Sequence, residues 1–282
     1  MSAYYFNRLC KVEIESQKAI DIKENRIKFE ITKSYNPREN IGRIEIWNLS
    51  LETRNQITAS NSLVRLFAGY EKFKGLLEIA QGDITNVRHN RNKTDTVTQI
   101  YLEEGYSVLR LNPVSFSFKG EVGLKEILSK IAEDTDLYFK LVHIEDSMSV
   151  TGGYSAIGGL DVVLNEMAVV FEFTWSMQSG IIILKGKKVE TGTEVMMLSP
   201  ASGLILNPES VKKISVRLVD DDDPLPQDTY AIQSLMQPHL QVYDTIVVKS
   251  PSLNGNFQIQ KISHTADSRG NDWYSNMEVI AI

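Results

Sequence analysis

The sequence predicts a mainly β protein of the α+β class, in which two similar antiparallel, barrel-like β domains flank a small α/β domain. Near both ends of the 282-residue chain, apolar residues alternate with polar ones, which is the period of a half-buried strand. Segments 63–103 and 244–282 also share one plan, namely a strand, a tight turn, a long strand, a polar loop and a closing strand. Only the middle of the chain carries helical periodicity. We therefore expect domains at 1–105, 106–200 and 201–282.

The first domain is expected to begin with strands whose apolar residues alternate, namely Val12 and Ile14, then Ile27, Phe29 and Ile31, then Ile44 and Ile46. Ser50 stands three residues before Thr53, as the N-cap of a short helical turn does. Trp47 is on the strand face opposite Ile46, so it either packs under another layer or lies at a subunit contact.

The rest of this domain is the first copy of the repeated plan. We expect a strand at 63–70, a turn at 71–75, a long strand at 77–87, a polar loop at 89–95 and a strand at 97–102. Alternating β-branched and aromatic residues favour the strands, and the polar stretches between them favour turns and loops.

The middle domain is expected to contain two units, each a helix followed by strand. The apolar residues of each helix follow the spacing of one helical face: Leu124, Ile127, Leu128, Ile131 and Ala132 in the first, and Leu160, Val163, Leu164, Met167 and Ala168 in the second. Strands are expected at 137–142, 169–175 and 181–184. The glycine-rich link at 151–159 is expected to be a mobile surface loop.

Between the two helical units of the middle domain and the second copy of the plan, further strands and a loop are expected. These are a strand at 195–198, a loop at 199–208, and strands at 214–219 and 232–240. Four consecutive aspartates at 220–223 repel one another, which predicts a solvated loop or one that meets a cation or a basic partner.

The second copy of the plan is expected to be a three-stranded meander. Its strands contain Ile246 and Val248, then Phe257, Ile259 and Ile262, then Tyr274, Met277, Val279 and Ile282. An Asn-Gly pair is the strongest short hairpin signal, so the first turn is expected at Asn254 and Gly255.

Charge and composition exclude several classes of protein. The chain has 30 basic and 36 acidic residues and a formal charge of −6, so it lacks the concentrated basic face that gripping DNA requires. Its one cysteine, Cys10, excludes an internal disulfide framework and a multi-cysteine zinc site. The sequence shows neither a secretory leader nor an apolar run long enough to span a bilayer. We therefore expect no stable membrane insertion and a protein that stays in a cytoplasm-like compartment or leaves it without a signal.

Candidates for catalysis are few. The four histidines are scattered without the i, i+4 spacing of a helical zinc pair, and we expect no metal and no cofactor. The densest polar cluster is His264 with Asp267 and Asp272, but a triad also needs a nucleophile on a sharp turn, and no G-x-S-x-G is present. We interpret the cluster as a hydrogen-bonded loop that holds the last strands, and the chain as not an enzyme.

The order of several short motifs resembles the baseplate hub proteins of tailed bacteriophages. The motifs are GRIEIWNLS at 42–50, AGY at 68–70 and GDI at 82–84, then LSPASGL at 198–204, SLMQP at 234–238 and HTADSRGNDWY at 264–274. The resemblance covers nearly the whole chain, in order. It marks as structural the residues Gly42, Trp47, Asn48, Leu49, Gly82, Asp83, His264, Asp267, Gly270, Asp272, Trp273 and Tyr274.

The resemblance implies the homotrimeric hub of a contractile tail or a related injection particle. Two similar β domains per chain would give a trimer six similar modules, matching a six-fold tail tube above and leaving three-fold symmetry for a spike or central fibre below. DNA would pass through the lumen without specific nucleic-acid binding. The chain would lie in the virion tail baseplate after assembly in the host cytoplasm. No lysozyme or peptidase domain is appended within these 282 residues, so wall-degrading activity is expected in another protein.

Two alternatives stay open. The first is a tail-associated cell-wall hydrolase or peptidase with its site near His264. The second is a receptor- or carbohydrate-binding module at the tail periphery. Such a module would favour exposed aromatic platforms, whereas Trp47, Trp175 and Trp273 all stand in strand-like or motif contexts.

Overall fold

The computed structural model describes residues 5–15, 19–36, 39–58, 62–111, 113–186, 196–205, 209–214 and 227–282. The acidic run expected to form a solvated loop, 220–223, lies outside the described residues. The described residues form two compact units. Unit 1 takes its described residues from Met1–Glu104, Thr191–Val216 and Leu225–Ile282, and unit 2 takes its own from Gly105–Glu190.

In the residues that the structure describes, unit 1 is built mainly of strands, together with the short helix α1 and the 3-10 turn η3. In chain order its elements are β1 (Arg8–Glu15), β2 (Ile20–Ile22), β3 (Ile27–Ser34), β4 (Ile41–Trp47), α1 (Leu51–Gln56), β5 (Leu63–Tyr70), β6 (Gly75–Asn92), β7 (Asp95–Glu103), β15 (Met196–Leu198), η3 (Pro200–Ser202), β16 (Glu209–Ile214), β17 (Gln227–Leu235), β18 (Thr245–Lys249), β19 (Asn254–Asp267) and β20 (Trp273–Ala281). The expected mainly β class is confirmed, whereas closure of either half into a barrel remains a prediction.

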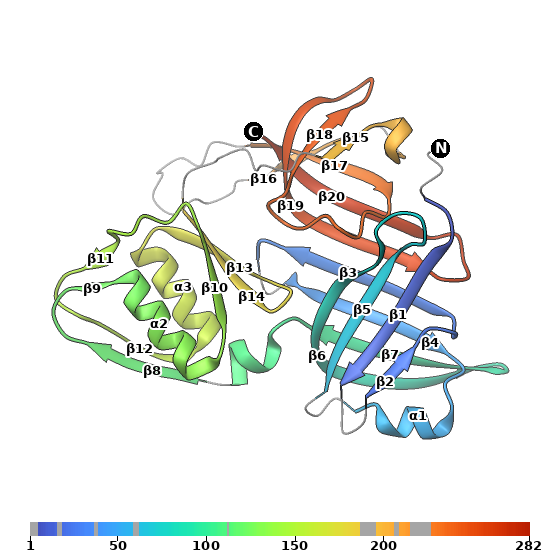
Figure 1. The fold of residues 1–282 in the computed structure, drawn as a ribbon, viewed down its shortest axis with the longest axis horizontal. Helices are drawn as coiled ribbons and strands as arrows, with labels where there is room; N and C mark the ends of the chain where they lie inside the picture. The colour runs from blue at the N-terminus through green and yellow to red at the C-terminus, as the bar shows by residue number, and fades with distance from the viewer. Residues whose placement is uncertain are drawn as a thin grey trace. The chain divides into compact units, whose positions relative to one another are not determined.

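The strands of unit 1 belong to one sheet in which a five-strand series occurs twice. The sheet order is β16-β17-β20-β19-β3-β4-β7-β6-β5-β1-β2, with β18 paired to β19 and β15 paired to β18 (Figure 1). The series β3-β4-β7-β6-β5 and the series β16-β17-β20-β19-β18 have the same order, and every pairing within each is antiparallel. The repeated plan expected from the sequence therefore extends from three strands to five.

The two long strands share an irregularity as well as a position. Against β7, the register of β6 shifts between Ile84 and Asn86. Against β20, the register of β19 shifts between Ile259 and Lys261. A bulge leaves one residue unpaired and bends the strand, so the two meanders bend at corresponding places.

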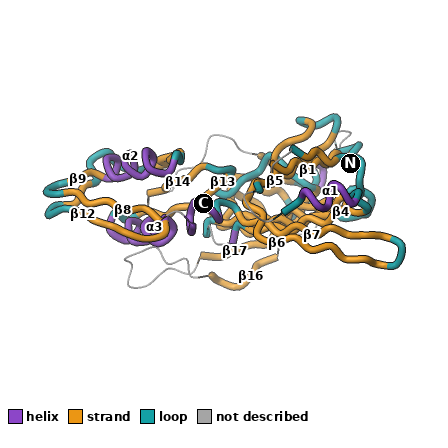
Figure 2. The backbone as a smooth tube through the Cα atoms, turned by 90° about the horizontal axis from the view of Figure 1, so that it is seen from below, coloured by secondary structure: helices purple, strands orange, loops and turns teal. Residues whose placement is uncertain are grey.

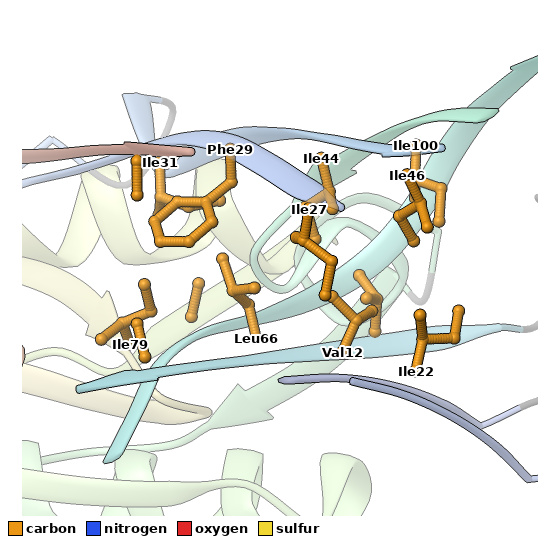
Figure 3. Packing of buried hydrophobic residues seen from close by; sticks show 14 of the residues in the cluster. Val12, Ile22, Ile27, Phe29, Ile31, Ile44, Ile46, Leu66, Ile79 and Ile100 are labelled. Atoms are coloured by element: carbon orange, nitrogen blue, oxygen red, sulfur yellow. The ribbon is translucent and has the colours of Figure 1, made fainter. Parts of the chain in front are cut away.

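The hydrophobic core of unit 1 fills the space between strands that face one another. Figure 3 shows Phe29 and Ile44, from β3 and β4, pointing toward Leu66 of β5 and Val12 of β1. The same cluster includes Trp273, which is fully buried, together with Met236 and Ala266 from the C-terminal part of the chain. The two ends of the sequence therefore share one core, and the division into separate first and third domains remains a prediction.

Unit 2 contains the two expected helices and several small sheets (Figure 2). Its elements are η2, a π-helical turn (Ser107–Leu111), β8 (Pro113–Phe118), β9 (Val122–Gly123), α2 (Leu124–Thr135), β10 (Tyr138–Val142), β11 (Ser149–Val150), β12 (Tyr154–Gly159), α3 (Leu160–Val170), β13 (Phe173–Gln178) and β14 (Ile181–Gly186). The apolar faces of both helices are buried, as their spacing predicts: Leu124, Ile127, Leu128 and Ile131 in α2, and Leu160, Val163, Leu164 and Met167 in α3.

Five boundaries differ from the sequence-based expectations, the first being that of the strand expected at 232–240, which the structure has as β17 and which ends at Leu235. The expected polar loop at 89–95 is a paired hairpin, because β6 and β7 pair as far as Asn92 and Asp95. The turn expected at Asn254 and Gly255 precedes them, since both residues pair with β18. The glycine-rich link is mostly strand, because β12 pairs with β8. The strand expected from residue 169 begins only at Phe173, after α3 ends at Val170.

The errors at 89–95, 151–159 and 254–255 have a common physical reason. Polar residues and glycines weaken a strand that stands alone, but a neighbouring strand supplies the backbone hydrogen bonds that keep them extended. Among the described residues, no helix is long and apolar enough to cross a bilayer.

Candidate functional site

The residues marked by the motifs gather at separate places in unit 1. Gly42 and Gly82 lie beside Leu102 and Glu103 of β7. A Cβ on Gly82 would stand 2.9 Å from the Glu103 carbonyl oxygen, and one on Gly42 would overlap the Ile31 side chain. The close approach of the β7 backbone explains Gly82, and the side chains of Ile31 on β3 and Leu102 on β7 fill the space beside Gly42. Asp83 follows at the point where β6 passes from β5 to β7.

Asn48 joins the end of β4 to the start of β7. Its backbone is left-handed, at φ 57°, which asparagine tolerates better than most residues. Its Nδ2 donates to Asp95 Oδ1 at 2.9 Å, and its Oδ1 accepts from the Thr96 amide at 2.9 Å. The neighbouring Leu49 is buried, and Ser50 caps α1 by accepting from the Thr53 amide at 3.0 Å, as predicted.

Arg26 connects the motif at the end of β4 with the motif after β19. Its Nε and Nη2 donate to the two carboxylate oxygens of Asp267 at 3.1 and 2.5 Å. Its guanidinium also lies 4.5 Å from the centre of the Trp47 ring, within the range of a cation–π contact. The hydrogen bonds from Arg26 hold the pKa of Asp267 below its ordinary value. Trp47 is half-buried, with the Arg26 guanidinium over its ring.

A surface cavity of about 450 Å³ surrounds this ion pair and is lined by Glu24, Asn25, Arg26, Trp47, Asn48, Asp95 and Arg269. The polar groups of its wall bond to one another. Besides the pairs above, Asn25 Nδ2 donates to the Trp47 carbonyl at 2.8 Å, and Arg269 Nη2 donates to the Glu24 carbonyl at 2.8 Å. The arrangement fastens four chain segments together, which is a structural task.

The polar cluster at His264 does not form a catalytic arrangement. The imidazole is 1% exposed, and its Nδ1 lies 2.9 Å from Ser275 Oγ. Burial lowers the pKa of His264 to about 3, so the ring is neutral. Asp267 is bonded to Arg26, and Asp272 contributes its backbone carbonyl to the Asp267 amide at 2.9 Å. A substrate has no access to this histidine, so the geometry does not favour a hydrolase.

Of the two adjacent aromatic residues, Trp273 lies in the core and Tyr274 lies partly at the surface. Trp273 is fully buried, with its ring centre 6.2 Å from that of Phe29 and 6.3 Å from that of Tyr70. Tyr274 is half-buried opposite Leu235. Gly270 packs against the Asp267 carboxyl, where a Cβ would come within 2.7 Å.

No tryptophan offers an exposed aromatic platform. Trp175 is 5% exposed and donates from Nε1 to Asn165 Oδ1 at 3.0 Å. Trp47 is half-buried beside Arg26, and Trp273 is in the core. The observation that would favour a carbohydrate-binding module is therefore missing from these three residues.

Sequence reasoning missed the counterpart of His264 in the first half. His89 of β6 occupies the same place relative to the bulge, and its Nδ1 lies 3.1 Å from Thr98 Oγ1. Both histidines end the pattern Ile-x-x-Val/Ile-x-His, at 84–89 and 259–264. Comparison of the two long strands with each other could have found this signal. Within the described part of the chain, no group of three or more histidine, cysteine or acidic side chains could hold a metal ion.

Comparison with solved structures finds the same fold in two proteins described as tail proteins, one of them from a prophage. The 43 kDa tail protein of prophage MuSo2 from Shewanella oneidensis superimposes with a TM-score of 0.66 at 9% identity, covering 96% of this chain and 98% of that one. A tail protein from Neisseria meningitidis MC58 gives a TM-score of 0.66 at 9% identity, covering 96% of each chain.

A secretion component shares the fold too. The Escherichia coli c3393 protein gives a TM-score of 0.59 at 11% identity and covers 95% of this chain and 76% of that one. It is described as a component of the type VI secretion system with structural similarity to the T4 bacteriophage tail proteins gp27 and gp5. No protein-family model and no curated protein matches the sequence. At identities this low, the likeness establishes the fold alone.

Proposed function

We propose, from the fold shared with these tail proteins, that the chain is a structural component of a phage-tail baseplate or a related injection particle. In this role it is a non-enzymatic hub and assembles as a homotrimer. The hub joins the tail tube on one side to a central spike or fibre on the other and leaves a lumen for DNA. The fold match over nearly the whole chain supports the first part of the proposal.

The observation that carries the trimer is the five-strand series that occurs twice in unit 1. Three chains with two similar modules each present six similar modules in a ring, which suits a six-fold partner above and a three-fold partner below. A protein with this task needs strand edges that neighbours can cover and no reacting groups. The buried, neutral His264 and the internally bonded cavity at Arg26 agree with that requirement.

A gene deletion with complementation tests the proposal. In-frame deletion is expected to abolish complete particles, which electron microscopy would record as free tubes or unfinished baseplates, and expression of the chain in trans is expected to restore them. Normal particles in the deletion strain would overturn the proposed function.

Two measurements on the purified chain separate the alternatives. Native mass spectrometry is expected to find three times the mass of the 31.8 kDa chain. Zymography on bacterial cell wall is expected to give no clearing. A clearing that persists in pure protein and is lost in His264→Ala would instead establish a wall hydrolase.

A further inference from the structure

The long strands β6 and β19 correspond residue by residue. Aligned at their bulges, His89 corresponds to His264, and the residues that face them, Thr98 and Ser275, correspond as well. In each copy the histidine Nδ1 lies near the facing hydroxyl oxygen, at 3.1 Å in the first and 2.9 Å in the second. The equivalence of the two halves therefore extends from strand order to individual side-chain contacts.

In the second copy, a strand from the first copy covers the edge of β19. β18 pairs with β19 as far as Gln258, and β3 pairs with β19 over 261–267. β20 pairs with β19 along both stretches, so β18 and β3 share the other edge of β19. This pairing places Glu30 of β3 opposite Thr265. The next residue of β19, His264, pairs with Ile31 of β3 and is 1% exposed.

In the first copy, the equivalent edge of β6 has no such cover. β5 pairs with one edge of β6 as far as Asp83, and β7 occupies the opposite edge from Asp83 onward. Over the described ranges of the chain, no strand pairs with the β5 side of β6 beyond that point. Arg88, His89 and Asn90 are exposed there. An uncovered edge of this kind is a site where another strand adds.

The repeated series identifies the strand that fits this edge. β16 stands in the second series where β3 stands in the first. Its residue Glu209 pairs with Ala231, and Glu30 of β3 pairs with Arg43, so the two glutamates correspond. β16 ends the sheet, and among the described residues its second edge meets no strand.

We infer that β16 of one copy pairs antiparallel with the uncovered edge of β6 in a second copy, as β3 pairs with β19 within the chain. The register transferred from that internal pairing is Glu209 opposite Asn90, Ser210 opposite His89 and Val211 opposite Arg88. Each copy provides one β16 and one β6 edge, so the contact is head-to-tail, the kind that closes into a ring. The inference deepens the proposed function by naming the strands that join the trimer, and we call their contact the seam.

Cysteine cross-linking tests the seam and its register. The double variant Asn90→Cys with Glu209→Cys places two thiols opposite one another, where facing Cα atoms of antiparallel strands lie about 4.5–5.5 Å apart, within disulfide range. Mild oxidation is expected to convert most of the chain into covalent trimer on a non-reducing gel, and reductant is expected to return it to monomer. Each single variant is expected to give no covalent trimer.

Two matched controls define the result. Glu30→Cys with Thr265→Cys occupies the equivalent positions of the internal pairing and is expected to form its disulfide within one chain. Arg91→Cys with Glu209→Cys moves one thiol by one residue, to the other face of β6, and is expected to give at least tenfold less covalent trimer. If the internal pair forms while the seam pair leaves the chain monomeric, or if the shifted pair cross-links equally well, the inference is overturned.

Hydrogen exchange on the unmodified chain gives a readout that needs no variant. Amides of 86–91 and 209–214 are expected to exchange more slowly in the assembled form than in the diluted monomer. Unchanged exchange in both segments, or a chain that stays monomeric at every concentration, would overturn the seam. The deletion experiment tests the proposed function independently of the seam. Complete particles whose Asn90→Cys and Glu209→Cys chain forms no cross-link would reject the seam and keep the proposed function.

Discussion

Two histidines in equivalent positions have opposite environments. His264 and His89 both lie beside a hydroxyl group on the facing strand. His264 is buried on β19, whose edge is paired with β3, whereas His89 is exposed on a stretch of β6 whose corresponding edge has no strand among the described residues. Burial disfavours the charged imidazolium, so His264 is held neutral and its pKa falls to about 3. Both histidines end the same local sequence pattern, so the difference arises from the tertiary surroundings of each strand.

The buried imidazole makes stability depend on pH. The unfolded chain binds a proton at His264 below about pH 6.5, whereas the folded chain does so only near pH 3. The contribution of His264 to the free energy of unfolding is therefore greatest above pH 6.5. It falls toward pH 3 by about 1.4 kcal/mol per pH unit. His239, whose pKa burial lowers to about 4, adds a smaller loss of the same sign.

Replacement of His264 isolates its contribution to the pH dependence of stability. His264→Gln is expected to reduce the slope of the free energy of unfolding between pH 6 and pH 4 by about 1.4 kcal/mol per unit, as measured by urea unfolding. Ser275→Ala is the matched control. It removes the contact with His264 and the acceptor of the buried Gln237 amide, costs about 2 kcal/mol at neutral pH, and leaves the slope in place. An unchanged slope in His264→Gln would contradict the assignment.

The sequence predicts which helices and strands form better than it predicts the residues at which they end. The spacing of apolar residues in α2 and α3 predicts both helices and their buried faces. The hairpin between β6 and β7 extends beyond the apolar alternation, because paired backbone keeps polar residues extended as far as Asn92. Alternation of apolar and polar residues marks a strand with one buried face. Where both faces of a hairpin are exposed to solvent, both carry polar residues and the alternation disappears.

The Arg26–Asp267 pair links the turn before β3 with the turn after β19. Arg26→Ala would leave the Asp267 carboxylate, whose side chain is 7% exposed, with one remaining backbone donor at 3.0 Å from Arg269. We expect a loss of about 2 kcal/mol in the free energy of unfolding, which is typical of hydrogen bonds to a charged group. Urea unfolding at pH 7 measures it.

A control and a pH series sharpen this result. Arg65→Ala breaks an exposed pair with Glu15 and is expected to cost less than about 0.5 kcal/mol. The pKa of Asp267 is lowered from 3.8, so the Arg26 contribution is present above pH 3.8 and is lost as the pH falls through the folded pKa. The difference between wild type and Arg26→Ala should therefore narrow in acid, and a difference that stays constant would count against the ion pair as its cause.

At the scale of the molecule, the two ends of the chain complete one another. β3 uses β19 as a neighbour, and Phe29 and Tyr70 pack on Trp273. Fragment 1–105 would leave the β3 edge open and remove this tryptophan from the core. It is expected to aggregate or to lack a cooperative unfolding transition by circular dichroism, in contrast to the full chain. A soluble fragment with a sharp transition would show instead that the first β domain folds alone.

The sequence by itself determined that the protein is mainly β, where its two helices lie, and that one strand plan occurs near both ends. These properties follow from local periodicity, which fixes which side chains of an element face a core. Tertiary structure alone decided that β3 pairs with β19, that Trp47 lies on Arg26, and that His264 is covered while His89 is not. The physical reason is that periodicity describes the faces of a strand, whereas its neighbour is chosen along its edges, through backbone groups that every residue carries alike.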